Sequence, residues 1–173
     1  AAKRARGRHD DIEILPGHGP VAAAQFRPTT DVFGDIAKEL ARTQRDWLSF
    51  WRAYALVRVH ASAQRNLIDP ALGRPAMKPL RDHLRNQFPR RAGEDWRLQH
   101  THAILALLDD PLNGLCRDLM RDLNQALEQR GKKLWMLYDD LDQDIKEDSQ
   151  WQADALGGLL RLAYDSNNQG LHN

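Results

Sequence analysis

A run of apolar residues at 134–138 ends in carboxylates, and these are the residues whose types and spacing could do chemistry. Asp139 and Asp140 follow the run directly, and Asp142 comes two residues later. Charges at the carboxyl end of a buried parallel strand lie at the crevice where α/β proteins bind ligands, and a carboxylate there can hold Mg²⁺ directly or through water. In that arrangement Asp139 would face the metal, and Asp140 would polarise an attacking water.

The same carboxylates also have a purely structural interpretation. A buried strand can end in exposed aspartates that begin a loop or cap the following helix. Asp144 and Asp148, further along the acidic stretch, fit that description as solvated positions. The residues alone leave both interpretations open for Asp139 and Asp140.

Histidines and the single cysteine offer weaker candidates. His100 and His102 are two residues apart, and on a helix they would point about 200° apart, which does not suit a shared metal ion. His18 lies between two glycines and is interpreted as a solvated loop histidine. Cys116 has leucines at helical spacing around it and is expected to be buried and inert. No serine or cysteine has the elbow or partner of a hydrolase triad.

One segment carries four aromatic side chains at helical spacing: Trp47, Phe50, Trp51 and Tyr54. Such a helix could present a partner-binding surface or a stacking platform for single-stranded nucleic acid. The same pattern is also typical of a helix buried on more than one side. The flanking arginines are Arg42, Arg45, Arg52 and Arg58. One of them could act as an arginine finger in an oligomer, but their spacing does not select which.

Composition excludes several classes of protein. With 173 residues and 42% hydrophobic content, the chain can bury the core of about one domain. Its 25 basic and 24 acidic residues nearly balance, so a nucleic-acid partner is unsupported. No stretch approaches the roughly 20 uncharged apolar residues of a membrane span, and no leader is recognisable. We therefore expect a cytoplasmic protein with no membrane partner.

The candidate carboxylates must be positioned by a strand, and a second strand is expected near the start of the chain. Apolar residues near 12–15 form a short β-type segment that ends in a loop rich in proline and glycine. Asp46 is expected to cap the aromatic helix, and Gly131 to end the helix that precedes the run at 134–138.

The order of strand, helices, strand and helix predicts a helix-rich α/β fold with a partial parallel sheet. Its strands would lie near 12–15 and 134–138, with a helical insertion over about 30–130 between them. We expect residues 1–10 to be a basic, flexible end and residues 11–173 to form the domain. An all-helical fold is the competing prediction.

The last helix is expected from about 149 to 164. Its predicted inner face consists of Trp151, Ala155, Leu156, Leu159, Leu160 and Ala163.

The run Leu-Trp-Met-Leu-Tyr-Asp-Asp-Leu-Asp, with the helix that follows it, resembles the Walker B strand and next helix of bacterial P-loop ATPases of the AAA+/STAND and KAP-like kind. The resemblance covers about 133–164. It implies a sheet of the P-loop NTPase type, with Asp139 as the Mg²⁺ ligand and Asp140 as the catalytic carboxylate. Asp142 has no role that the resemblance carries over.

The phosphate-binding loop of these ATPases, Gly-x-x-x-x-Gly-Lys-Ser/Thr, is missing from the sequence. The chain also lacks an initiating Met, and we expect it to be an internal fragment that is inactive alone. Mg²⁺ and ATP would then bind only in the longer parent protein. The helical region could contact a protein partner or a second copy. The alternative function is a helical interaction or scaffold domain without nucleotide chemistry.

Overall fold

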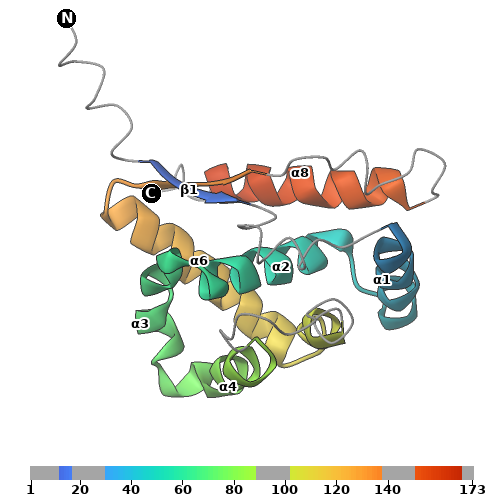
Figure 1. Ribbon diagram of the computed structural model, residues 1–173, viewed down its shortest axis with the longest axis horizontal. Helices are drawn as coiled ribbons and strands as arrows, with labels where there is room; N and C mark the ends of the chain where they lie inside the picture. Colours follow the sequence, from blue (N-terminus) through green and yellow to red (C-terminus); the bar gives the residue numbers. More distant parts are fainter. Residues whose placement is uncertain (1–11, 17–29, 89–101, 138–150, 169–173) are drawn as a thin grey trace, which may run out of the picture.

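Helices make up most of the chain that the computed structural model describes, which comprises residues 12–16, 30–88, 102–137 and 151–168 (Figure 1). The strands are β1 (Ile12–Pro16) and β2 (Lys133–Leu137). The helices are α1 (Thr30–Thr43), α2 (Trp47–Ala61), α3 (Asp69–Leu72), α4 (Lys78–Gln87), α6 (Leu112–Gln129) and α8 (Gln152–Asn168). Shorter helical pieces are η3 (Ala63–Leu67), η4 (Pro75–Met77) and a turn at 102–106.

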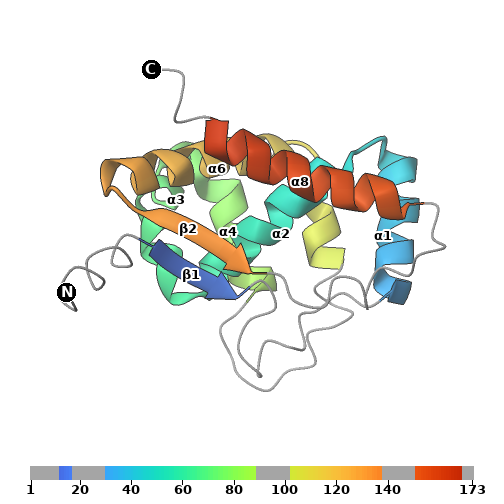
Figure 2. The ribbon, with the colours of Figure 1, turned by 90° about the horizontal axis from the view of Figure 1, so that it is seen from above.

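The two strands pair in parallel, with Ile12 opposite Lys133 and Pro16 opposite Leu137. Figure 2 shows the two arrows side by side and pointing the same way. Two strands and their parallel pairing were predicted from the sequence, and this part of the prediction is confirmed.

The predicted fold class, a helix-rich α/β fold with a P-loop NTPase-type sheet, is wrong. Within the described residues these two short strands are the whole sheet, and the chain is predominantly helical. The sequence analysis took the run at 134–138 for a buried parallel strand, but Trp135 on β2 is 51% exposed. The core consists almost entirely of residues on helices and helical turns, so burial of apolar surface stabilises a helical assembly here.

Helix α2 lies at the centre of this core and contacts both α8 and α6. Most of its residues are buried all round the helix, which confirms that it is covered on more than one side. The helix starts where the sequence predicted, because the Asp46 side chain accepts a hydrogen bond of 2.8 Å from the backbone N–H of Ser49.

Helix α6 ends at the predicted glycine. Gly131 has a φ of +60°, a conformation that glycine adopts without a Cβ penalty. The N–H of Gly131 donates to the carbonyl of Glu128, and the N–H of Lys132 donates to the carbonyl of Leu127, both at 2.9 Å. This cap turns the chain directly into β2.

The inner face of helix α8 was predicted correctly only in part, and Trp151, Leu156 and Leu159 do pack against the core. Ala155 and Leu162 are buried, whereas Leu160 is 71% exposed and Ala163 is also exposed. The helix packs closely on α2 at Gly158, and this contact turns Leu160 and Ala163 away from the core. The apolar residues of α8 are therefore divided between a buried face and an exposed one.

Cys116 lies on α6 and is buried, as its spacing predicted. Burial raises the pKa of its thiol to about 12, and the charge of Arg52 opposes this rise only in part. The ordinary thiol pKa is 9.0, so the stabilisation associated with the protonated thiol is complete below pH 9 and is lost between pH 9 and about 12.

We expect the Cys116 thiol of the folded protein to resist alkylation by iodoacetamide at pH 8. The thiolate is the reactive form, and a pKa near 12 leaves only about one thiol in 10⁴ ionised at that pH. Mass spectrometry should find the folded protein unmodified and the urea-unfolded protein fully modified. Alkylation of the folded protein at the rate of a free cysteine would contradict the buried assignment.

Candidate functional site

The predicted carboxylates lie just beyond the described part of β2. This strand ends at Leu137, and Asp139 and Asp140 belong to the range 138–150, outside the described residues. The structure describes what precedes them: β2 pairs with β1 and contacts α6. Because the strands are parallel, Pro16 and Leu137 lie at the same end of the pair. Along the sequence, Asp139 is two residues from that shared end.

A groove of about 980 Å³ runs between α1 and α8, next to the start of α2. Its large apolar lining residues are Leu40, Trp47, Leu48 and Trp151. Its small lining residues are Gly34, Ala37, Ala41, Ala153, Gly157 and Gly158. Its charged lining residues are Lys38, Arg45, Asp46, Asp154 and Arg161. The described lining contains no serine, cysteine or histidine.

Asp46 is the carboxylate at this groove with a shifted pKa. Burial raises the pKa of Asp46, but hydrogen bonds from Ser49 and the positive charges of Arg52 and Arg161 outweigh that effect and hold the pKa below its ordinary value. Asp46 is therefore ionised at neutral pH. Its carboxylate already accepts the capping hydrogen bond of α2, which gives it a structural role.

The aromatic side chains of α2 are part of the core, which confirms the structural interpretation. The buried set is Trp47, Phe50, Trp51 and Tyr54. Phe33 on α1 packs against Trp51 with ring centroids 5.9 Å apart, and Trp151 stacks on Phe33 at 5.8 Å. These rings are covered by neighbouring helices, so they offer no platform on which bases could stack.

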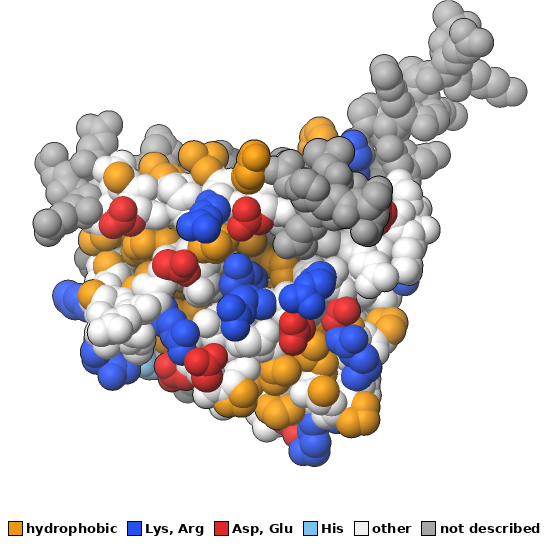
Figure 3. Space-filling model, turned by 180° about the vertical axis from the view of Figure 1, so that it is seen from behind, with side chains coloured by type: hydrophobic (Ala, Val, Ile, Leu, Met, Phe, Trp, Pro, Cys, Tyr) orange, Lys and Arg blue, Asp and Glu red, His pale blue; other side chains and the backbone are white. Residues whose placement is uncertain are grey.

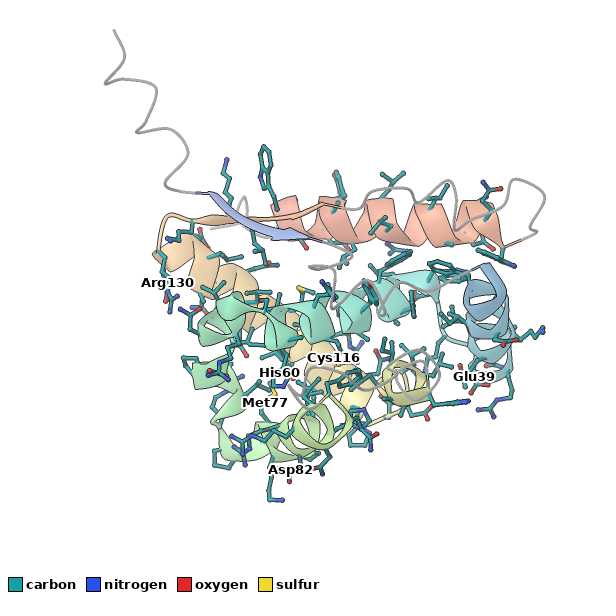
Figure 4. The ribbon with its side chains drawn as sticks, viewed as in Figure 1. Glu39, His60, Met77, Asp82, Cys116 and Arg130 are labelled. Carbon is teal, nitrogen blue, oxygen red and sulfur yellow. The ribbon has the colours of Figure 1, made fainter. Side chains whose placement is uncertain are left out.

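The arginines near α2 have different surroundings. Arg42 pairs with Glu39 on the same exposed face of α1, and Figure 4 shows Glu39 at the outer edge of the molecule. Arg45 pairs with Asp110 at 3.0 Å. Burial lowers the pKa of Arg52. Nothing in these contacts selects an arginine finger, and Figure 3 shows basic and acidic side chains interspersed on the rear face.

His60 and Arg58 are buried polar residues near the end of α2 that the sequence-based search did not identify as buried. The Nδ1 atom of His60 has no hydrogen-bond partner among the described residues, and the side chain lies in the interior (Figure 4). Burial lowers the pKa of His60, Arg65 and Arg85 lower it further, and Asp69 opposes them. Arg58 is the one polar residue within the otherwise apolar stretch 53–59, and His60 directly follows that stretch; these positions were the signal that could have shown their burial.

The remaining candidates from the sequence are not assembled into a site. His18 and His100 lie outside the described residues, and His102 is an exposed residue at the start of a helical turn. In the described ranges, no cluster of three or more His, Cys, Asp or Glu side chains could hold a metal ion. Over the same ranges, no helix combines the length and the apolar character needed to cross a membrane.

The resemblance found in the sequence has no independent support from known proteins. Comparison with protein-family models, with curated proteins and with solved structures finds no match to this chain.

Proposed function

We propose that this chain is a fragment of an ATP-binding and ATP-hydrolysing P-loop ATPase and that it contributes the carboxylates of the Mg²⁺ site. The observation that supports the proposal is the parallel pairing of β1 with β2, directly before Asp139 and Asp140 in the sequence. Carboxylates at the carboxyl end of a parallel strand are suited to bind Mg²⁺ and to orient a water. A cytoplasmic setting, where ATP is available, is part of the proposal.

The residues of this chain fit only part of a nucleotide site. Carboxylate oxygens are the ligands that Mg²⁺ prefers, so Asp139 is suited to hold the metal. Asp140 would accept a hydrogen bond from the attacking water and orient it. The sequence contains no Gly-x-x-x-x-Gly-Lys-Ser/Thr segment to bind the phosphates, so the chain alone is expected to hydrolyse no ATP.

The test uses the longer parent protein, in which we expect Gly-x-x-x-x-Gly-Lys-Ser/Thr within some tens of residues before Ala1. Asp140→Asn in that protein should leave ATP affinity unchanged and lower kcat by about 10²-fold, because the amide orients water poorly. Asp139→Asn should raise the Mg²⁺ concentration needed for half-maximal activity.

Asp144→Asn is the matched control, since it removes a carboxylate of the same acidic stretch to which we assign no role. Its kcat should equal that of the unmodified protein. Equal turnover in the Asp140 variant, or a parent sequence without the phosphate-binding motif, would reject the ATPase proposal.

A second candidate function is a helical interaction or scaffold domain without nucleotide chemistry. The observation that favours it is the set of large apolar side chains that a predominantly helical structure leaves exposed: Trp135, Leu160 and Tyr164. Calorimetric titration of the parent protein with Mg²⁺ and ATP distinguishes the two, because only the ATPase should bind the nucleotide.

A further inference from the structure

Helix α8 carries an apolar stripe on the face that points away from the core. The stripe consists of Ala153, Gly157, Leu160 and Tyr164, whose spacing of four, three and four residues places them on one side of a helix. All four are exposed, with Leu160 at 71% and Tyr164 at 68%. Figure 1 shows α8 along one edge of the molecule, with α2 beneath it.

We infer that this stripe is the docking surface for a second copy of this chain, with the two α8 helices packed antiparallel. Along the chain the stripe has two small residues followed by two large ones. A second stripe that runs in the opposite direction therefore sets its large residues against the small residues of the first. An antiparallel pair would place Tyr164 of one copy against Ala153 of the other and Leu160 against Gly157. A two-fold axis between Gly157 and Leu160 generates both contacts from one surface. This inference does not depend on the proposed ATPase activity.

The groove beside α8 provides room for the large side chains. Ala153 and Gly157 line it together with Gly34 and Ala37 of α1. A Cβ atom added to Gly157 would meet no atom within 4 Å, so the space next to this part of the stripe is open. Ala153 and Tyr164 are 11 residues apart on the helix, or about 16 Å. The small residues and the groove therefore lie at the start of the stripe, and the large residues lie at its end.

Charges on one flank of the stripe favour the same antiparallel register. Asp154 and Arg161 are both exposed and lie seven residues apart, so they share one side of α8. In an antiparallel helix pair, each flank of one helix faces the same flank of the other. Arg161 of each copy therefore faces Asp154 of the other copy, which gives two symmetric contacts. Exposed ion pairs contribute little to affinity, but they oppose the wrong register and orientation. The other flank, with Leu156 and Ala163, is apolar.

The test is sedimentation velocity of the chain across a concentration series, from about 5 to 500 µM, because one helix pair is a small interface and should dissociate on dilution. We expect a reversible monomer–dimer equilibrium. Leu160→Asp, which places a charge against Gly157 of the other copy, should raise the dimer dissociation constant by at least about tenfold. Ala76→Asp, which likewise places a charge on an exposed apolar residue, here in η4, is the matched control and should leave it unchanged.

A charge reversal tests the register. Arg161→Glu and Asp154→Arg should each weaken the dimer, and the double variant should restore it, because the reversed charges again face each other. Circular dichroism of every variant establishes that α8 is still folded. A monomer at all concentrations, a dimer insensitive to Leu160→Asp, or a double variant no stronger than the single ones would overturn the inference.

Discussion

Replacement of Trp51 by alanine is expected to lower the free energy of unfolding by about 3–5 kcal/mol. Trp51 on α2 is 1% exposed, and its ring packs against Phe33, Phe50 and Tyr54. Its indole Nε1–H also donates a hydrogen bond of 2.7 Å to the carbonyl oxygen of Ala155, which ties α2 to α8. Alanine removes both the packing and this link, and it leaves a cavity at the centre of the helical assembly.

Urea denaturation followed by circular dichroism measures this effect, because the four other tryptophans would complicate a fluorescence signal. Trp51→Phe is the matched control. It keeps most of the ring packing and removes the hydrogen bond, so it should cost less than the alanine variant, by an amount that separates packing from the polar link. An alanine variant as stable as the unmodified protein would show that Trp51 does not occupy the core as described.

Two adjacent glycines of α8 should respond to alanine in opposite directions. A Cβ atom on Gly158 would lie 2.6 Å from the Cβ and 2.8 Å from the backbone carbonyl carbon of Trp47, distances that force α8 away from α2. We expect Gly158→Ala to destabilise the protein by about 1–3 kcal/mol, since overpacking outweighs the gain in helix propensity. Gly157→Ala meets no atom within 4 Å and should stabilise the helix by up to about 1 kcal/mol.

Both glycine variants are compared by urea denaturation at a protein concentration low enough to keep the chain monomeric. Both variants replace a glycine of α8 by alanine and so change helix propensity by the same amount. The difference in unfolding free energy between the two variants therefore isolates the contact of residue 158 with Trp47. If Gly158→Ala were stabilised as much as Gly157→Ala, the close approach of α8 to α2 at this position would be wrong.

Local signals along the chain were sufficient to predict most individual elements. Asp46 and Gly131 were identified as helix ends because a capping carboxylate and a glycine at positive φ satisfy backbone groups within a few residues. The spacing of apolar residues likewise predicted that Cys116 is buried, which the structure confirms. Asp139 and Asp140 stay predictions, since they lie outside the described residues.

The fold class was not predictable in the same way. An apolar run at 134–138 has the same composition whether it lies inside a broad sheet or on a two-stranded pair with one face open, and Trp135 shows that the second case applies. Local pattern does not report which neighbours cover a strand, because those neighbours come from distant parts of the chain.

Helix α8 shows where the sequence stops being informative. Its residues alone specify a helix with apolar side chains on two sides, and they contain the small and large residues of the stripe in their order. The packing of α8 on α2, at Gly158 against Trp47 and at Ala155 against Trp51, determines which side is buried, and it depends on the position of α2 in the tertiary structure. That packing leaves Leu160 and Tyr164 exposed to solvent, and the proposed dimer follows from it.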